Sequence, residues 1–314
     1  MTRFFPAFLA LITLVLPSAA QEVENVFLIT LDGLRWEELF TGADAWLLDN
    51  EDYTSGVEEL RSKYWSDDPA ERRIALMPFF WSTIASQGSL YGNRLKGSRV
   101  NVTNTRVFSY PGYNEILTGF ADSTITSNDK NPNHNITVLE WINDLPEFKG
   151  KVAAFGSWDV FPFIVNEDRS GIPVNAGFES AEGDLSDRES WLNELQAQTP
   201  SPWSTVRLDV FTHNFALEYV KRERPRLVYI AYGETDDFAH NRDYDHYLNA
   251  AHRTDAMIRD LWEWVKADDQ YRGKTAFVIT TDHGRGAEDR WIGHGRDWVG
   301  SSNIWIALLG PGIE

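Results

Sequence analysis

Short apolar stretches that alternate with amphipathic ones constrain the fold of this chain more than any other feature. Stretches typical of buried strands occur at Val26–Leu31, Val152–Phe155, Leu227–Tyr232 and Ala276–Thr281, and a fifth strand is predicted at Asn303–Leu309. Strands that are apolar along their whole length are usually buried on both faces. The pattern therefore predicts a largely parallel sheet that is covered by helices on both sides.

Helical periodicity fills the gaps between these strands. We expect a short helix at Val138–Leu145 and longer ones at Pro78–Tyr91, Trp203–Lys221 and Asp243–Val265. In the last of these, apolar residues recur on one face and Asp243 is a suitable N-cap. The predicted fold class is an α/β three-layer sandwich with small cap insertions.

Two segments do not follow this alternation. Residues 36–73 are rich in Glu, Asp and Trp, and residues 159–200 are rich in Pro, Gly, Asp and Ser. We interpret both as insertions in a single domain that spans residues 21–314, where they could cap a site.

The first 20 residues have the pattern of a secretory signal peptide. Arg3 gives a short basic start, Phe4–Leu16 is apolar but short for a membrane span, and Ser18–Ala20 supplies small residues before Gln21. An uncleaved membrane anchor is the alternative. No later segment is apolar for long enough to span a bilayer, so we expect a secreted or periplasmic protein without a transmembrane segment after cleavage.

The charge balance and the lack of cysteine narrow the possible partners. A net charge of −18, from 47 acidic and 29 basic residues, argues against a nucleic-acid polymer, because such binding depends on Lys and Arg. A small phosphate ester is still compatible, since a metal ion can dominate the field inside one pocket. Because the chain has no cysteine, a metal site must use His, Asp and Glu.

Three of the predicted strands end in carboxylates, and two of them have a histidine nearby. The side chains concerned are Asp32, Asp236, Asp282 and His283, with His240 and His294 following closely in the chain. Singly, an Asp-Gly after a strand is usually a turn or a helix cap. In an open α/β sheet, however, ligands bind outside the carboxyl ends of the strands, where these residues would converge. Carboxylates and imidazoles together suit two divalent ions.

The segment RVFSYPGYNEILTGF supplies a candidate nucleophile. Ser109 precedes Pro111, and GYNEILTG is typical of a short helix that ends at Gly119. Ser109 would then lie at a helix N-terminus, where free N–H groups favour an anion. A plain N-cap role for Ser109 is the alternative.

Five elements occur in the order that they have in the alkaline phosphatase superfamily, which the chain resembles from about residue 25 to its end. They are strand-Asp-Gly (Asp32), the nucleophile before a short helix (Ser109), Asp-x-x-x-His (Asp236, His240), Asp-His-Gly (Asp282, His283) and a last histidine (His294). The stretch SYPGYNEILTGF most resembles the nucleotide pyrophosphatase/type I phosphodiesterase branch. That branch usually has Thr in place of Ser109 and Asn in place of Gly112.

The resemblance implies a phosphohydrolase with two divalent metal ions, usually zinc, and a phosphoserine intermediate at Ser109. One metal would be held by Asp236, His240 and His294. The other would be held by Asp32, Asp282, His283 and Ser109. An asparagine of the branch binds a phosphoryl oxygen; Asn128 is the nearest match, with Asn131 next.

The sequence constrains the identity of the substrate less than it constrains the type of reaction. Aromatic residues near the site favour a diester or nucleotide-like substrate: Trp36, Tyr110, Tyr113, Trp158 and Phe161. Lys130, Arg35 and Arg296 are candidate charge partners for a phosphomonoester instead.

Several alternative functions are compatible with parts of the sequence. A sulfatase of the same superfamily is disfavoured because there is no Cys and because Tyr113 stands where its modification motif has Arg. A phosphoglycerate mutase is disfavoured by the signal peptide, and a phosphoethanolamine-type transferase by the lack of membrane helices. A secreted, non-catalytic calcium-binding protein would leave the three histidines unused, because calcium prefers oxygen ligands.

Overall fold

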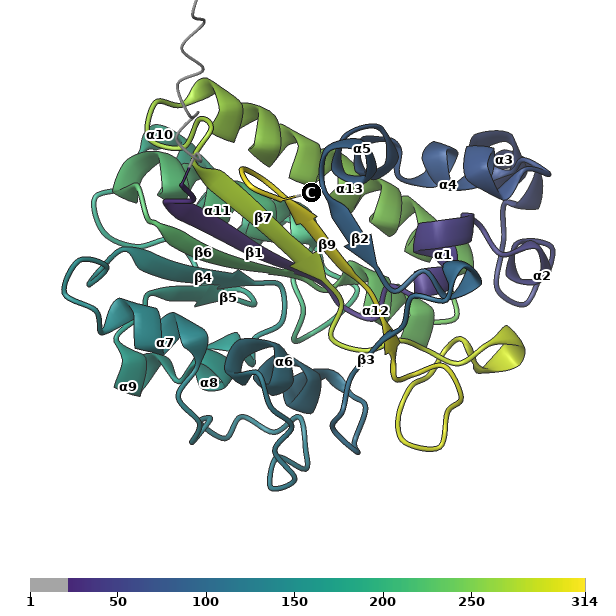
Figure 1. Cartoon of the computed structure of the whole chain (residues 1–314), viewed down its shortest axis with the longest axis horizontal. Helices are drawn as coiled ribbons and strands as arrows, with labels where there is room; N and C mark the ends of the chain where they lie inside the picture. The colour runs from purple at the N-terminus through teal and green to yellow at the C-terminus, as the bar shows by residue number, and fades with distance from the viewer. Residues whose placement is uncertain (1–21, 314) are drawn as a thin grey trace, which may run out of the picture.

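A seven-stranded sheet runs through the centre of the molecule (Figure 1). Its strands are β1 (Asn25–Leu31), β2 (Ser89–Tyr91), β4 (Val152–Gly156), β5 (Val174–Ala176), β6 (Leu227–Tyr232), β7 (Thr275–Thr280) and β9 (Ile306–Leu309). They lie in the order β2-β9-β7-β1-β6-β4-β5, and β7, β1, β6, β4 and β5 are parallel. Strands β3 (Val100–Asn101) and β8 (Asn303–Ile304) form a separate antiparallel pair.

The computed structural model describes residues 22–313. The predicted signal peptide, residues 1–20, lies outside the described residues. Within them, no helix has the length and apolar character that a membrane crossing requires.

Helices cover both faces of the sheet, as predicted (Figure 1). On one face lie α6 (Ser109–Thr118), α7 (Val138–Asn143), α8 (Phe161–Val165) and α9 (Glu167–Ser170). On the other lie α10 (Asp187–Gln198), α11 (Asp209–Glu223) and α13 (Tyr244–Ala267), with α12 (Glu234–His240) before α13. Beside them are α1 (Trp36–Thr41), α2 (Ala45–Leu48), α3 (Val57–Tyr64), α4 (Pro69–Leu76), the π-helical η1 (Phe80–Ile84) and α5 (Ala85–Gln87). Two 3₁₀ turns, η2 (Arg94–Lys96) and η3 (Glu288–Arg290), complete the set.

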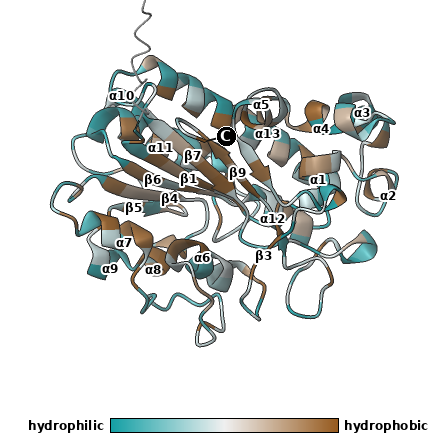
Figure 2. Ribbon diagram, viewed as in Figure 1, coloured by the Kyte–Doolittle hydropathy of each residue, from teal (hydrophilic) through white to brown (hydrophobic). Residues whose placement is uncertain are grey.

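Alternate residues of the central strands enter two separate apolar cores. Phe27 and Ile29 of β1 lie in the core under α11 and α13, whereas Leu28 lies in the core under α6 and α8. Figure 2 shows the central strands as predominantly hydrophobic along their length. This two-sided burial is the reason that the strands read as continuous apolar runs, and it confirms the predicted three-layer sandwich.

The predicted fifth strand is wrong in detail. The segment Asn303–Leu309 is split: β8 pairs with β3, and β9 runs antiparallel to β7 in the main sheet. Trp305 lies between them, fully buried, and its indole Nε1 donates to the carbonyl of Leu34. Inserting this large ring turns the chain between two sheets, which periodicity alone does not signal.

Two predicted helices differ from the observed ones by more than two residues at one end. The helix predicted at Pro78–Tyr91 ends at Gln87, and its last residues form strand β2. A Cβ on Gly88 would lie 1.9 Å from the carbonyl oxygen of Leu308, so only glycine permits this approach to β9. The helix predicted from Trp203 starts at Asp209, because Val206 forms a β-bridge with Trp158.

The two segments interpreted as insertions lie in different places. Residues 36–73 form α1 to α3 and the start of α4, beside the sheet (Figure 1). Residues 159–200, in contrast, include β5, which pairs with β4 and extends the central sheet itself. Part of this second segment thus belongs to the core layer rather than to a cap. Its three-residue strand is too short to recognise by periodicity.

Buried His213 should make stability depend on pH. Its Nδ1 lies 2.9 Å from the hydroxyl of Tyr232, and burial lowers the pKa of His213 to about 4. The unfolded chain then binds the proton more readily, so stability due to neutral His213 is complete above about pH 6.5 and is lost as the pH falls toward 4. We expect up to about 3 kcal/mol of the free energy of unfolding to depend on this residue across that window.

Urea unfolding at about pH 7 and about pH 4.5 checks this expectation. His213→Gln should lose less stability on acidification than the wild type. The same change at exposed His246 serves as the control. An equal loss in wild type and His213→Gln would contradict the assignment.

Candidate metal centre and nucleophile

The candidate ligands lie at the carboxyl edge of the sheet, where adjacent parallel strands end. Leu31 of β1 pairs with Tyr232 of β6, and Thr30 pairs with Thr280 of β7. The residues that follow these strands therefore emerge side by side. They are Asp32 after β1, Asp236 in the first turn of α12 after β6, and Asp282 and His283 after β7.

One cluster consists of Asp32, Asp282 and His283. His283 Nε2 lies 3.4 Å from Asp32 Oδ1 and 3.4 Å from Asp282 Oδ2. All three side chains are buried. Their ligand atoms lie close enough together to bind one metal ion.

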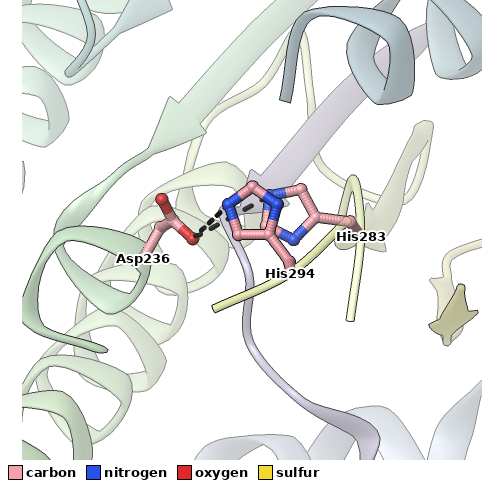
Figure 3. Close-up of side chains that lie close together, drawn as sticks. All are labelled: Asp236, His283 and His294. Carbon is pink, nitrogen blue, oxygen red and sulfur yellow. Dashed lines mark ion pairs between the residues drawn. The ribbon is translucent and has the colours of Figure 1, made fainter. Parts of the chain in front are cut away.

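A second cluster consists of Asp236, His283 and His294 (Figure 3). Asp236 Oδ1 lies 3.8 Å from the Nε2 atoms of both histidines. The rings of His283 and His294 stack with their centroids 3.8 Å apart. His240 joins from the end of α12, with its Nε2 3.1 Å from Asp236 Oδ2 and 3.1 Å from His294 Nε2. All six predicted Asp and His ligands are therefore in one place.

Added positive charge would favour the ionised form of two buried carboxyl groups at this site, Asp32 and Asp282. Burial and the neighbouring Asp236 raise the pKa of Asp32 well above its usual value, and burial and Asp32 do the same for Asp282. Burial also acts against ionisation of Asp236, but the charges of His240 and Arg285 hold its pKa well below the usual range. Burial and the nearby His283 lower the pKa of His294, which keeps its imidazole neutral and able to bind a metal.

The hydrogen bonding of the carboxylates also fits a metal site. Asp32 Oδ1 and Asp282 Oδ2 are buried without a hydrogen-bond partner. The other oxygen of each carboxylate accepts a hydrogen bond. Tyr113 donates to Asp32 Oδ2 at 2.7 Å, and the Gly33 N–H donates to Asp282 Oδ1 at 3.1 Å. An unpartnered buried carboxylate oxygen is costly unless a cation binds it. The two free oxygens both face His283, so this donor set fits a divalent ion.

Ser109 lies at the predicted position and is the first residue of α6. Phe108, and not Ser109, occupies the N-cap position, so the simple capping role does not apply. The hydroxyl Oγ lies 3.4 Å from His283 Nε2, at the edge of the metal clusters. Ser109 is therefore a buried hydroxyl at a helix N-terminus that faces the candidate ligands.

Asn128 reaches the same helix terminus from the loop that follows α6. Its Oδ1 accepts a hydrogen bond of 3.0 Å from the N–H of Tyr110. Asn131, the alternative match, instead contributes only its carbonyl, which accepts from the Tyr110 hydroxyl. The amide of Asn128 is thus anchored through its oxygen beside Ser109.

Arg285 is the residue at the centre that sequence reasoning missed. It is fully buried, its Nη1 pairs with Asp236, and its Nε and Nη2 donate to the carbonyls of Trp291 and Ile292. It stands only two residues after His283, so a cation inside the motif DHGRG was the available signal. Through these bonds Arg285 ties Asp236 to the loop that leads to His294.

The residues predicted to contact the substrate differ in burial and in their partners. Arg35 is wrong as a charge partner, because it is fully buried and paired with Glu38. Lys130 forms a 2.7 Å ion pair with Asp159, whereas Arg296 is exposed and donates to the carbonyl of Thr105. Among the aromatic residues, Tyr113 and Phe161 pack against each other in the core, so they do not line an open cleft.

The sequence matches a family model across most of its length. Residues 44–310 match the model described as type I phosphodiesterase / nucleotide pyrophosphatase. The chain belongs to this family. The matched region includes Ser109 and the residues from Asp236 to His294, whereas Asp32 precedes it. Members of this family are hydrolases of the alkaline phosphatase superfamily. No curated protein sequence is significantly similar to the chain.

Several solved structures share the fold of this chain. A protein in the alkaline phosphatase superfamily from Vibrio parahaemolyticus is 13% identical with a TM-score of 0.52, and the alignment covers 93% of this chain and 61% of that one. The lipoteichoic acid synthase LtaP from Listeria monocytogenes is 12% identical with a TM-score of 0.55, over 94% and 67%. A 2-O GAG sulfatase is 12% identical with a TM-score of 0.57, over 93% and 65%. The chain thus spans about two thirds of these proteins.

Gly33→Ala should disrupt the centre of this family member. Gly33 has φ +61, and an added Cβ would lie 2.7 Å from Asp236 Oδ1 and 2.8 Å from Arg285 Nη1. Displacing a catalytic group by about 1 Å can cost 10²-fold in rate, so we expect hydrolase activity to fall by about 10²-fold. The left-handed backbone adds a stability cost of about 1–2 kcal/mol.

Gly150→Ala is the matched control, because Gly150 has φ +72 but open space around its Cα. It should lose similar stability and keep its activity. If both variants lose activity equally, the close approach at Gly33 is not the cause. Thermal unfolding and steady-state hydrolysis measure the two effects.

Proposed function

We propose that the protein is a secreted or periplasmic two-metal hydrolase of phosphate esters that works through a phosphoserine at Ser109. We further propose that it prefers phosphodiesters or nucleotide-like substrates. One observation carries the proposal: the Ser109 hydroxyl lies 3.4 Å from His283 Nε2, beside the unpartnered oxygens of Asp32 and Asp282. A nucleophile, a ligand set and a helix N-terminus thus coincide.

The ligands divide into two sets in this proposal. Asp236, His240 and His294 would hold one divalent ion, and Asp32, Asp282, His283 and Ser109 the other. Zinc suits the mixture of imidazole and carboxylate ligands. When bound, the ions would supply positive charge that lowers the pKa of the serine hydroxyl and stabilises negative charge on the phosphoryl oxygens.

The side chains of the protein have separate roles. Ser109 Oγ attacks phosphorus and displaces the leaving group, and water then cleaves the serine phosphate to restore the hydroxyl. The free N–H groups at the start of α6 favour the anionic phosphoryl group there. The Asn128 amide, held by its oxygen, directs Nδ2 to a phosphoryl oxygen. Tyr113 and the N–H of Gly33 orient the carboxylates of Asp32 and Asp282.

Three nitrophenyl esters test this function. The protein from Gln21 onward, loaded with zinc, is assayed on p-nitrophenyl phosphate, bis(p-nitrophenyl) phosphate and p-nitrophenyl sulfate. We expect kcat/KM to be highest for the diester, by about tenfold or more. EDTA should abolish turnover and zinc should restore it.

The other outcomes are equally informative. Preference for the monophosphate would make the protein a phosphomonoesterase, and preference for the sulfate would make it a sulfatase. Turnover that survives complete metal removal would contradict the two-metal proposal. Calcium binding without turnover of any ester would favour a non-catalytic binding protein.

A further inference from the structure

The positive charge of this acidic protein is unevenly distributed. No Asp or Glu occurs between Glu71 and Glu115, a stretch that carries six Arg and Lys residues and ends with the nucleophile segment. The chain as a whole has a net charge of −18. A basic stretch in such a protein marks a local field that differs in sign from the rest of the surface.

Five cations come from this region and from the loop after His294; Arg94 and Arg99 interact, and Arg296 donates to the carbonyl of Thr105, next to Arg106. We call them the basic rim: Arg94, Lys96, Arg99, Arg106 and Arg296. In the described part of the chain, no carboxylate forms an ion pair with any of them. Elsewhere surface cations are typically paired, for example Arg61 with Asp49 and Lys63 with Glu59. Lys151, Arg242 and Arg290 also have no carboxylate partner among the described residues, but they are not close in sequence as four of the rim cations are.

Sheet topology brings the rim to the same edge as the metal centre. Tyr91, at the end of β2, pairs with Ile306 of β9, and Ile306 pairs with Thr280, the last residue of β7. The chain after β2 therefore leaves the sheet at the same edge as Asp282 and His283, which follow β7. Figure 1 shows β3 and the loop before β8 at this edge.

Hydrogen bonds connect the segment that carries Arg106 to Arg296 and to the candidate ligand His294. Arg296 Nε donates to the carbonyl of Thr105, next to Arg106, at 3.2 Å. The carbonyl of Val107 lies 3.2 Å from Nδ1 of the candidate ligand His294. Arg106 is thus three residues before Ser109, in a segment that is bonded to the loop of His294 and Arg296.

The rim residues also act on each other. Burial and the charge of Arg99 lower the pKa of Arg94, so these two guanidinium groups are close enough to repel. In the part of the chain that the structure describes, Arg94 donates to the Val100 carbonyl and to Asn101 Oδ1, which are both uncharged. Asp297 follows Arg296 but pairs with none of these cations. The charge of Glu37 acts in the opposite direction but more weakly than that of Arg99, and an anion bound at the rim would relieve the remaining repulsion.

We propose that the basic rim binds a second anionic group of the substrate, outside the phosphate that is cleaved, and that Arg106 and Arg296 contact this group. The proposal rests on the proposed function and narrows its substrate class. The substrate is a phosphate ester with at least one further phosphate, sulfate or carboxylate group. The metal centre takes the scissile phosphate, and the rim selects esters by their additional charge.

A matched pair of substrates tests the proposal. Thymidine 5′-(p-nitrophenyl phosphate) and its 3′-phosphorylated form differ only in a second anionic group. Wild-type protein should hydrolyse the 3′-phosphorylated ester with a kcat/KM about tenfold higher, as expected for one charge-assisted guanidinium–phosphate contact. Arg106→Gln and Arg296→Gln should each reduce this ratio, and the double variant should bring it close to one. Raising the ionic strength from about 0.02 M to about 0.5 M should also reduce it.

Arg272→Gln is the control for loss of one positive charge. Arg272 is exposed, pairs with Asp269 and lies just before β7, at the opposite edge of the sheet. It should keep the wild-type ratio. A wild-type ratio near one, with both esters hydrolysed, would overturn the inference and leave the proposed function intact.

A binding measurement separates the inference from the proposed function. If the protein hydrolyses neither ester, the proposed function fails. Calorimetric titration with thymidine 5′-phosphate and thymidine 3′,5′-bisphosphate then still decides the inference. Tighter binding of the bisphosphate that is lost in Arg106→Gln supports the rim as an anion site, and equal binding overturns it.

Discussion

Ser109→Ala should lower kcat by about 10⁴-fold or more while the amount of bound metal stays the same. The loss is large because the proposed reaction passes through an ester of this hydroxyl. The fold should be unaffected, since within residues 22–313 the Ser109 hydroxyl makes one hydrogen bond, of 3.4 Å, with His283 Nε2. Steady-state turnover, zinc content and thermal unfolding are measured on the same preparation.

Ser86→Ala is the control for this experiment. Ser86 is a helical serine whose hydroxyl donates to the carbonyls of Ser82 and Thr83, away from the metal centre. It should retain wild-type turnover. If Ser109→Ala keeps near-normal activity, water rather than a serine attacks phosphorus, and the phosphoserine is absent.

Asp282→Asn and His240→Ala should each remove one of the two metal ions, and not the same one. Asp282 belongs to the cluster with Asp32, whereas His240 contacts Asp236. Each variant should contain about one zinc in place of two and lose at least about 10³-fold in kcat/KM, because an ion supplies several kcal/mol of charge stabilisation. In Asp282→Asn the side-chain oxygen can still accept the hydrogen bond from the N–H of Gly33. Without metal, this variant should therefore be no less stable than the wild type.

His246→Ala is the matched control for His240→Ala. Both histidines are exposed and both lie within 4 Å of a neighbouring aspartate, but His246 faces Asp245 in a separate acidic cluster. Its loss should leave two metals and full activity. Wild-type metal content in His240→Ala would refute the division of ligands proposed above.

The layers of the fold and the position of the candidate ligands could be predicted because both follow from local signals. Four apolar runs became β1, β4, β6 and β7, since strands buried on both faces must be apolar throughout. Parallel strands end at one edge, so the residues that follow them, such as Asp32 and Asp282, had to come together. A different local signal, Pro111 in a first helical turn and Gly119 at the helix end, predicted Ser109 at the start of α6.

Other features depend on long-range contacts and have no local signal. Strand β2 exists because Gly88 allows the chain to approach Leu308, which is distant in sequence. Arg35 looked available for substrate, yet Glu38 neutralises it inside the core. Tyr113 is one of the aromatic residues that suggested an organic group on the substrate, although its hydroxyl donates to Asp32. Side-chain partners of this kind become visible only when the fold is assembled.

The central position of β1 has a consequence for the order of events during folding. Its two neighbours come from the far end of the chain: Val26 pairs with Leu227 in β6, and Asn25 pairs with Thr275 in β7. Such distant pairing closes very long loops and is slow to form. Asp32 therefore meets its partners only after most of the polypeptide has been synthesised. Metal uptake should be a late kinetic step, and the rate at which zinc is acquired during refolding should report completion of the sheet.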